Sequence, residues 1–289
     1  MGGELGGARV LFTTAGPGTE PLRANLGLHV GDDPDLVHAR RSALAREVGR
    51  PLVWMEQTHS VGVAVLDRAS AVPAHGDVDA GTGTVLQERT GPTAPDPSEG
   101  EWGTLDADGV VIDARGWPSA PGVAVMVADC LPVLLADSSG EVVAAVHAGR
   151  KGLAGGILSR AVSLMAPLVG GADRLHALIG PAVCGRCYEV PAALRAAVAR
   201  THPASRSLTS WGTPSLDLPA GAEEELRGLG LLDVRRDGRC TREDPGLHSH
   251  RRDPRCGRQV GVVLPRVRTG AARCDDMPRV LGPGPIDLN

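Results

Sequence analysis

The sequence has few aromatic residues: Phe, Trp and Tyr together make up 2% of its 289 residues. A close-packed core must therefore be built from Val, Leu and Ala. Six cysteines in a chain of this length are too few for a disulfide scaffold, which favours free thiols or metal thiolates in a reducing compartment. No secretory signal is visible at the N-terminus, and Asp129 and Pro132 interrupt the longest apolar run, so it cannot span a membrane. We expect a cytoplasmic protein.

Neither sign of charge is in large excess. Thirty Lys and Arg residues against 34 Asp and Glu residues give a formal net charge of -4. This balance gives no electrostatic reason to expect nucleic acid or a membrane surface as a partner. With 42% apolar residues the chain is long enough for one large domain or two small ones. We expect a monomer.

Short strand-like runs alternate with helical stretches along the chain. Asp33 and Pro34 predict the N-cap and first position of a helix over residues 31–49. Three nearly continuous apolar runs at 122–129, 131–137 and 141–148 predict strands covered on both faces. Further strands are expected at 9–14, 51–57, 61–67, 176–183 and 258–266, and further helices at 152–169, 191–202 and 220–230. This order indicates a layered α/β or α+β domain.

One segment interrupts the regular pattern. Residues 87 to about 104 are rich in Pro, Gly and charge, and strand-like runs resume on both sides of them. This composition is typical of a flexible surface insertion within one domain, rather than of a linker between two domains.

Three residues stand out as candidates for chemistry: His59 in QTHS, Cys130 in ADCLP and His147 in VHAGRKG. Two imidazoles and one thiolate form a suitable ligand set for Zn²⁺, with a fourth position left for water or substrate. The same donors also bind copper. Separations of 71 and 17 residues are unlike the local spacings of metal motifs, so a buried thiol and hydrogen-bonded histidines remain open as alternatives.

Several segments, taken in order, carry a family resemblance. FTT and NLGLHVGDDP come first, then WMEQTHS, LDADGVV, ADCLPVLLAD, VHAGRKGLAGGIL, IGPAVCGRCYEV, DGRCT and SHRRDPRCGRQVGVV. Together they resemble the YfiH-like proteins, long called multicopper polyphenol oxidases or laccase-domain proteins and later assigned purine nucleoside phosphorylase activity. The resemblance implies an α+β fold of layered α/β/β/α type with mixed sheets, related to the CNF-type toxins and other cysteine hydrolases. It also implies a single catalytic domain over residues 1–289.

The resemblance implies that His59, Cys130 and His147 form the metal site and are the catalytic residues, with zinc as the expected metal and copper as the alternative. The implied activity is phosphorolysis of adenosine, inosine, guanosine and methylthioadenosine to the base and ribose 1-phosphate, together with deamination of adenosine. Deamination would use a water activated by zinc, as in the zinc deaminases.

Phosphorolysis also needs positive side chains to balance the phosphate dianion. Candidates are Lys151, in the small basic turn after His147, together with Arg40 and Arg251. Asn25 and Asp129 are candidates for positioning the nucleoside or the metal ligands.

The sequence departs from the family pattern at two places. It has HAGRKG where the family has HAGWRG, so Arg150 replaces a tryptophan and Lys151 an arginine. Lysine keeps the charge but lacks the two-pronged geometry of arginine. It also has LHSHRR where the family has FFSYRR, which puts His248 and His250 in place of aromatic residues. Both changes bear on substrate preference and leave the three metal-site residues intact.

The remaining cysteines offer a rival constellation. Cys184 and Cys187 form a CxxC motif, and Cys240 and Cys256 would complete a four-thiolate structural zinc site. A packing role is the simpler interpretation of Cys187 and Cys240. Cys274 has no assigned role.

Other functions remain to be weighed. A copper-dependent polyphenol oxidase is disfavoured, because multicopper oxidases need about ten His ligands in paired HxH motifs. This chain has nine His residues, and only His248 and His250 form such a pair. A cysteine-type cell-wall editing hydrolase would use Cys130 as nucleophile and His59 or His147 as base. A non-catalytic nucleotide-binding protein would use the metal only for structure.

Overall fold

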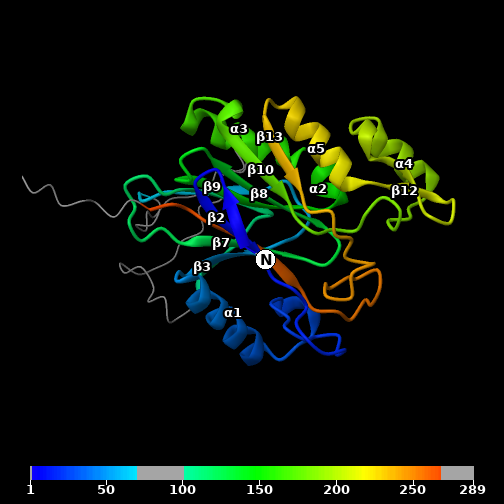
Figure 1. Ribbon diagram of the computed structural model, residues 1–289, viewed down its shortest axis with the longest axis horizontal. Coiled ribbons are helices and arrows are strands. Elements are labelled where there is room, and N and C mark those ends of the chain that lie inside the picture. The colour runs from blue at the N-terminus through cyan, green and yellow to red at the C-terminus, as the bar shows by residue number, and fades with distance from the viewer. Residues whose placement is uncertain (1, 70–100, 268–289) are drawn as a thin grey trace, which may run out of the picture.

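A computed structural model describes residues 2–69 and 101–267. Two six-stranded sheets pack face to face, and helices cover the outer face of each (Figure 1). Helix α1 (Pro34–Val48) lies on one side, and α3 (Ile157–Val169) and α5 (Leu218–Gly228) lie on the other. The expected layered α+β fold with mixed sheets is confirmed.

Both sheets contain parallel and antiparallel pairs. The first has the order β1 (Gly2–Leu5), β2 (Ala8–Phe12), β14 (Gln259–Leu264), β7 (Gly122–Val127), β3 (Leu52–Glu56), β5 (Glu101–Asp106). The second has the order β13 (Asp233–Arg236), β10 (Leu175–Ile179), β8 (Leu131–Asp137), β9 (Val142–Ala148), β6 (Gly109–Asp113), β4 (Val63–Leu66). A separate hairpin joins β11 (Arg206–Leu208) and β12 (Pro214–Leu216).

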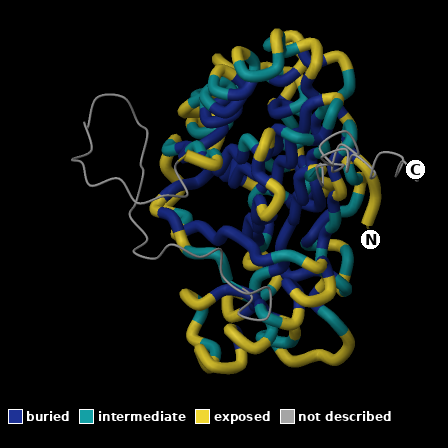
Figure 2. The backbone as a smooth tube through the Cα atoms, turned by 90° about the vertical axis from the view of Figure 1, so that its left-hand side faces the viewer, coloured by how far each residue is buried: buried dark blue, intermediate teal, exposed yellow. Residues whose placement is uncertain are grey.

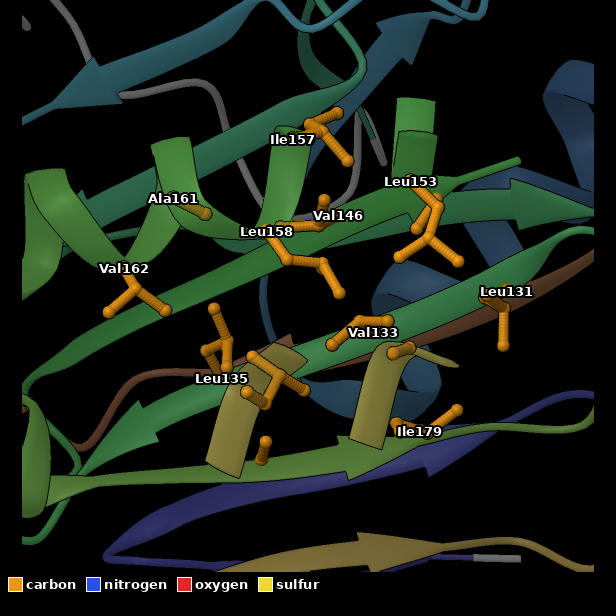
Figure 3. Close-up of a cluster of buried hydrophobic side chains, with 14 of the residues drawn as sticks. Leu131, Val133, Leu135, Val146, Leu153, Ile157, Leu158, Ala161, Val162 and Ile179 are labelled. Carbon is orange, nitrogen blue, oxygen red and sulfur yellow. The ribbon is translucent and has the colours of Figure 1, made fainter. Parts of the chain in front are cut away.

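The core forms three layers between and outside the sheets. Every residue of β7, β8 and β9 is buried, which confirms that these strands are covered on both faces. Figure 2 shows this buried interior between exposed loops at the ends of the molecule. On the outer face of the second sheet, Val133 and Val146 pack with Leu158 and Val162 of α3 (Figure 3). Aliphatic side chains dominate all three layers, as the scarcity of aromatic residues predicts.

The helix boundaries follow local signals. The carboxylate of Asp33 accepts the N–H of Asp35 at 2.9 Å at the start of α1, and Gly49 ends that helix with a φ of 76°. The prediction of one helix over 152–169 is wrong. The chain forms α2 (Arg150–Ala154), breaks at Gly155 and Gly156, and continues as α3. Gly156 has a φ of 84°, which a helix cannot contain.

The remaining elements are short. They are α4 (Ala192–Ala199) and the 3-10 turns η1 (Leu28–Val30), η3 (Ala172–Arg174) and η4 (Pro203–Ser205). Of the expected insertion, residues 87–100 lie outside the described residues, as does Cys274, whereas 101–104 belong to β5. Among the described residues, no helix is both long and apolar enough to cross a membrane.

Candidate metal centre

His59, Cys130 and His147 come together from three segments, and we call them the histidine cluster. His59 lies between β3 and β4, Cys130 directly precedes β8, and His147 lies on β9, opposite Pro132 of β8. Their potential ligand atoms all lie within 4.8 Å of one another. The Nε2 atom of His59 is 3.9 Å from the Sγ atom of Cys130, and the two imidazole rings meet edge to face with centroids 4.8 Å apart.

The fully buried carboxylate of Asp108, between β5 and β6, connects two of these residues. It accepts the backbone N–H groups of Thr58, His59 and Ser60 at 3.3, 3.1 and 2.6 Å, and the Ser60 hydroxyl at 2.7 Å. It also lies 2.7 Å from Nδ1 of His147. A proton on Nδ1 shared with this carboxylate leaves Nε2 of His147 as the atom able to bind a metal.

The backbone is strained at one residue of the histidine cluster and at one residue next to it. His59 has a φ of 62° and Asp129, next to Cys130, a φ of 93°. Such conformations cost a non-glycine residue about 1–3 kcal/mol and persist only where neighbouring contacts enforce them. At Asp129 the contacts are hydrogen bonds to the carboxylate from the Thr241 hydroxyl at 2.6 Å and from the backbone N–H of Arg251 at 2.7 Å.

The surroundings of the histidine cluster favour its charged forms. Burial acts to raise the pKa of Cys130, but hydrogen bonds and charge from His147 and His59 outweigh it and lower the pKa to about 6. Burial acts to lower the pKa of His147, but Asp108 and Cys130 raise it to about 9. Against its own burial, bonds from His147 and Ser60 lower the pKa of Asp108. These shifts favour the thiolate of Cys130, and a metal bound at Nε2 of His147 would displace the proton on that nitrogen while Nδ1 keeps its own.

Gly149 leaves room at the centre of the cluster. A Cβ atom at this position would lie 3.0 Å from Sγ of Cys130 and 3.0 Å from Cδ2 of His59. Any larger residue would therefore push against two potential ligands.

The donor set fits a catalytic zinc ion on chemical grounds. Two imidazoles and a thiolate converge, and a carboxylate fixes the orientation of one imidazole. Zinc enzymes commonly use a carboxylate in this way to orient a histidine ligand. Sequence reasoning missed Asp108. Its only signal was the ADG turn within LDADGVV, which looks like an ordinary link between strands.

The basic residues that could bind phosphate differ in how many contacts their side chains already make. Lys151, the only lysine of the chain, is exposed on α2, and within the described residues its amine forms no hydrogen bond or ion pair. Arg150 beside it is half-buried. Arg251 is exposed, with its guanidinium 4.5 Å from the ring centre of Tyr188 and bonded to the carbonyl of Glu189 at 2.9 Å.

Asn25 and Arg40 belong to one network beside η1. The buried Asn25 amide bonds to Gly27 and to the Asp32 carboxylate at 3.0 Å. Arg40 bonds to the same carboxylate at 2.6 Å. The turn that they hold carries His29, whose pKa is lowered by burial and by nearby positive charges that include His147 and His59.

The two histidines that replace family aromatics have different surroundings. His248 is buried, and its Nε2 lies 3.0 Å from the carbonyl oxygen of Arg23. Burial lowers its pKa to about 4 although this carbonyl acts to raise it. His250 is exposed.

A second convergence involves Cys184, Cys187, Cys240 and Glu243, which we call the cysteine cluster. Their potential ligand atoms also lie within 4.8 Å of one another. Cys256 is buried apart from them, beside Arg258, so the rival set of four thiolates does not form. The fourth potential ligand is instead the carboxylate of Glu243, which no sequence motif predicts there. Cys187 and Cys240 also pack against Val183, as the simpler interpretation expects.

Comparison with known proteins adds to this geometry. The family described as multi-copper polyphenol oxidoreductase laccase matches residues 9–266. A Streptomyces coelicolor protein named purine nucleoside phosphorylase is 41% identical over 268 residues, which cover 90% of this chain and 96% of that protein. A Mycobacterium tuberculosis protein of the same name is 40% identical over 260 residues, which cover 88% and 90%.

Solved structures share the fold. YlmD from Geobacillus stearothermophilus matches with a TM-score of 0.70 and 28% identity, over 90% of this chain and 92% of that one. A Neisseria meningitidis protein of the DUF152 family matches with a TM-score of 0.69 and 30% identity, over 90% and 94%.

Proposed function

Since this chain belongs to the family described as multi-copper polyphenol oxidoreductase laccase, and relatives 40% and 41% identical to it are named purine nucleoside phosphorylase, we propose that it is a metal-dependent purine nucleoside phosphorylase. The proposed substrates are adenosine, inosine, guanosine and methylthioadenosine, with adenosine deamination as a second activity. The observation that carries the proposal is the convergence of His59, Cys130 and His147 beside the buried carboxylate of Asp108.

The proposed ligands are Nε2 of His147, Sγ of Cys130 and a ring nitrogen of His59. A zinc ion held there would supply Lewis acidity, which zinc enzymes use to activate water or a substrate oxygen. Asp108 keeps the Nδ1 proton of His147 in place and fixes the turn that carries His59. Asp129 holds the backbone before Cys130 through its bonds to Thr241 and Arg251.

In phosphorolysis a phosphate oxygen forms a bond to C1′ of the ribose. The bond from C1′ to the purine nitrogen breaks, and its electron pair leaves with the base, which takes up a proton. Positive side chains must balance the attacking dianion. Lys151 is the first candidate because its amine is exposed and otherwise unengaged, and Arg251 is the second. Asn25 and Arg40 act indirectly in this proposal, by holding the turn that carries His29.

A product assay tests the proposal. The zinc-loaded protein is incubated with adenosine, with and without phosphate, and the products are separated. We expect adenine and ribose 1-phosphate only with phosphate, and inosine with or without it. Absence of both adenine and inosine would refute both activities.

Metal analysis tests the ligand set independently of activity. The Cys130→Ala variant should hold less zinc than the wild type. A zinc content unchanged by this substitution would contradict the assignment of Cys130 as a ligand.

A cysteine hydrolase is the second candidate, because Cys130, His147 and Asp108 also form a thiol, imidazole and carboxylate series. The lowered pKa of Cys130 is what a nucleophilic cysteine requires. The two candidates respond differently to metal removal. Chelation should abolish a zinc-dependent phosphorylase and leave a cysteine hydrolase active, whereas alkylation of Cys130 should inactivate both.

A multicopper oxidase is less well supported. Its copper centres need about ten histidine ligands. Among the described residues, only the histidine cluster and the cysteine cluster bring three or more potential ligands together, and they contain two histidines in total. The absence of phenol oxidation by copper-loaded protein is therefore expected.

A further inference from the structure

We propose that the cysteine cluster is a second metal site, in which Cys184, Cys187, Cys240 and Glu243 bind a structural zinc ion. It is separate from the histidine cluster and does not depend on the function proposed above. Nothing in the proposed chemistry uses these side chains, yet four potential ligands lie within 4.8 Å of one another.

The two halves of the site share one local geometry. In the first half, the N–H groups of Cys187 and Tyr188 both donate to the carbonyl of Cys184, at 2.9 and 3.0 Å. In the second half, the N–H groups of Glu243 and Asp244 both donate to the carbonyl of Cys240, at 3.1 and 2.8 Å. The segments CGRC and CTRE therefore present ligands three residues apart from two similar turns, the spacing that CxxC motifs use in structural zinc sites.

Backbone contacts hold the two turns together. Ala182 and Cys240 form a parallel bridge, and the N–H of Thr241 donates to the carbonyl of Ala182 at 3.1 Å. The N–H of Cys184 points at Sγ of Cys240, 3.4 Å away. This N–H therefore ties the turn that carries Cys184 to the sulfur atom of Cys240.

The ligand types favour zinc. Three thiolates select a soft or borderline metal, and a carboxylate is an accepted fourth ligand of Zn²⁺. The Cys187 thiol lies 3.3 Å from Oε1 of Glu243, so a zinc ion would take the place of the proton between them. Arg186, whose guanidinium lies 3.5 Å from Glu243, would offset part of the negative charge of four anionic ligands. A disulfide would use only two of the three thiols and leave the carboxylate without a role.

The position of the site indicates what it stabilises. Val183, next to Cys184, donates its N–H to the carbonyl of Asp129 at 3.0 Å. Thr241, next to Cys240, donates its hydroxyl to the carboxylate of Asp129 at 2.6 Å. Both halves thus hold the residue that precedes Cys130. A zinc ion in the cysteine cluster would therefore hold the backbone at Asp129 in place, and with it the position of Cys130.

Zinc content tests the proposal. The full chain is purified under reducing conditions, saturated with zinc, desalted and analysed by mass spectrometry of the metal. We expect about two zinc ions per chain in the wild type, and about one in both Cys187→Ser and Cys130→Ala. Cys256→Ser is the matched control, because it removes a buried thiol outside the cluster and should keep the wild-type content. A content in Cys187→Ser equal to that of the wild type overturns the proposal.

A second measurement leaves the three cysteines of the cysteine cluster intact. Cobalt bound to the Cys130→Ala protein should give an intense near-ultraviolet band from sulfur-to-metal charge transfer, because only the cysteine cluster then supplies thiolates. Glu243 is exposed, so Glu243→Gln should fold normally and weaken cobalt binding by more than about tenfold. Absence of the sulfur band overturns the proposal.

The outcomes also separate this proposal from the function proposed above. Loss of the second zinc in Cys187→Ser, together with no phosphorolysis by the wild type, would support the cysteine site and refute only the enzyme assignment.

Discussion

The thiol of Cys130 lies beside two imidazoles, whereas that of Cys187 lies beside a carboxylate and two further thiols. Burial acts to raise the pKa of both. At Cys130 the imidazoles reverse this effect, and at Cys187 the neighbouring Glu243, Cys240 and Cys184 add to it. Because burial acts in the same direction at both thiols, the different partners account for the opposite directions of the two pKa shifts.

The two clusters also differ in their backbone conformation and in their number of potential ligands. The histidine cluster has three potential ligands and strained residues at His59 and Asp129. The cysteine cluster has four potential ligands on two regular turns. Three ligands leave a coordination position for substrate, whereas four complete a tetrahedral site. The first arrangement is suited to catalysis and the second to stability.

Removing a ligand from one cluster should give the largest effect. In Cys130→Ser we expect the rate of phosphorolysis to fall by more than about a hundredfold. This exceeds the usual loss when a residue that only hydrogen-bonds to a metal ligand is changed. Zinc in the cysteine cluster should remain, so the metal content falls by about half. Product assays and metal analysis of one preparation check both. Loss of all zinc would show that the clusters are not independent.

Asp108→Asn should be next in size. The amide keeps the shape of the side chain but loses the charge that orients His147, so zinc affinity of the histidine cluster should fall by about tenfold to a hundredfold. Unpaired buried donors should also lower the free energy of unfolding by about 1–3 kcal/mol. Competition with a chelator and urea unfolding measure the two effects. Asp106→Asn, which changes an exposed carboxylate, is the control, and equal losses in both variants would contradict the role of Asp108.

Within the described part of the chain no carboxylate contacts the buried imidazole of His248, so this residue shows the effect of burial on its pKa. Its pKa is about 4 when folded, below the ordinary value of 6.5, so the unfolded chain takes up the proton first. The stabilisation is complete above pH 6.5 and is lost as the pH falls towards 4, about 2 kcal/mol between pH 7 and pH 5. Urea unfolding should show this slope in the wild type and a shallower one in His248→Phe.

The exposed His250 supplies the control for that measurement. His250→Phe should keep the wild-type dependence on pH. A slope unaffected by His248→Phe would mean that other groups cause the loss of stability.

Thiol reactivity should give the smallest difference. In chelated protein at pH 7, Cys130 should be alkylated about fivefold faster than an ordinary thiol, because its larger thiolate fraction outweighs its lower intrinsic nucleophilicity. Its rate should rise through pH 6 and level off above pH 7. Cys187, whose pKa is raised, should react only at high pH. Mass spectrometry of the alkylated protein as a function of pH measures both rates. Equal rates at Cys130 and Cys187 would contradict the predicted difference between the two thiols.

Local signals predicted much of the fold. Asp33 and Pro34 start α1 as expected, because capping depends on neighbouring residues alone. The break at Gly156 was missed because isolated glycines are common within helical patterns. Strand β1, with the sequence GGEL, has little strand propensity and is formed by pairing with β2.

The site was less accessible to sequence reasoning. Their residue types made His59, Cys130 and His147 candidates for a zinc ligand set, but their separations along the chain carry no local signal, so the family resemblance was needed to support that assignment. Asp108 could not be found because its hydrogen-bond partners lie 39 and 49 residues away. The CxxC half of the cysteine cluster was visible, but Glu243 owes its position to a tertiary contact.

The exposed side chain of Lys151 has a practical consequence. Because the chain has no other lysine, an amine-directed fluorophore has a single side-chain target, four positions beyond His147. Apart from the terminal amine, labelling is therefore site-selective without mutagenesis. A dye attached there would also remove the positive charge proposed to balance phosphate, so the native sequence already provides a chemical test of that role.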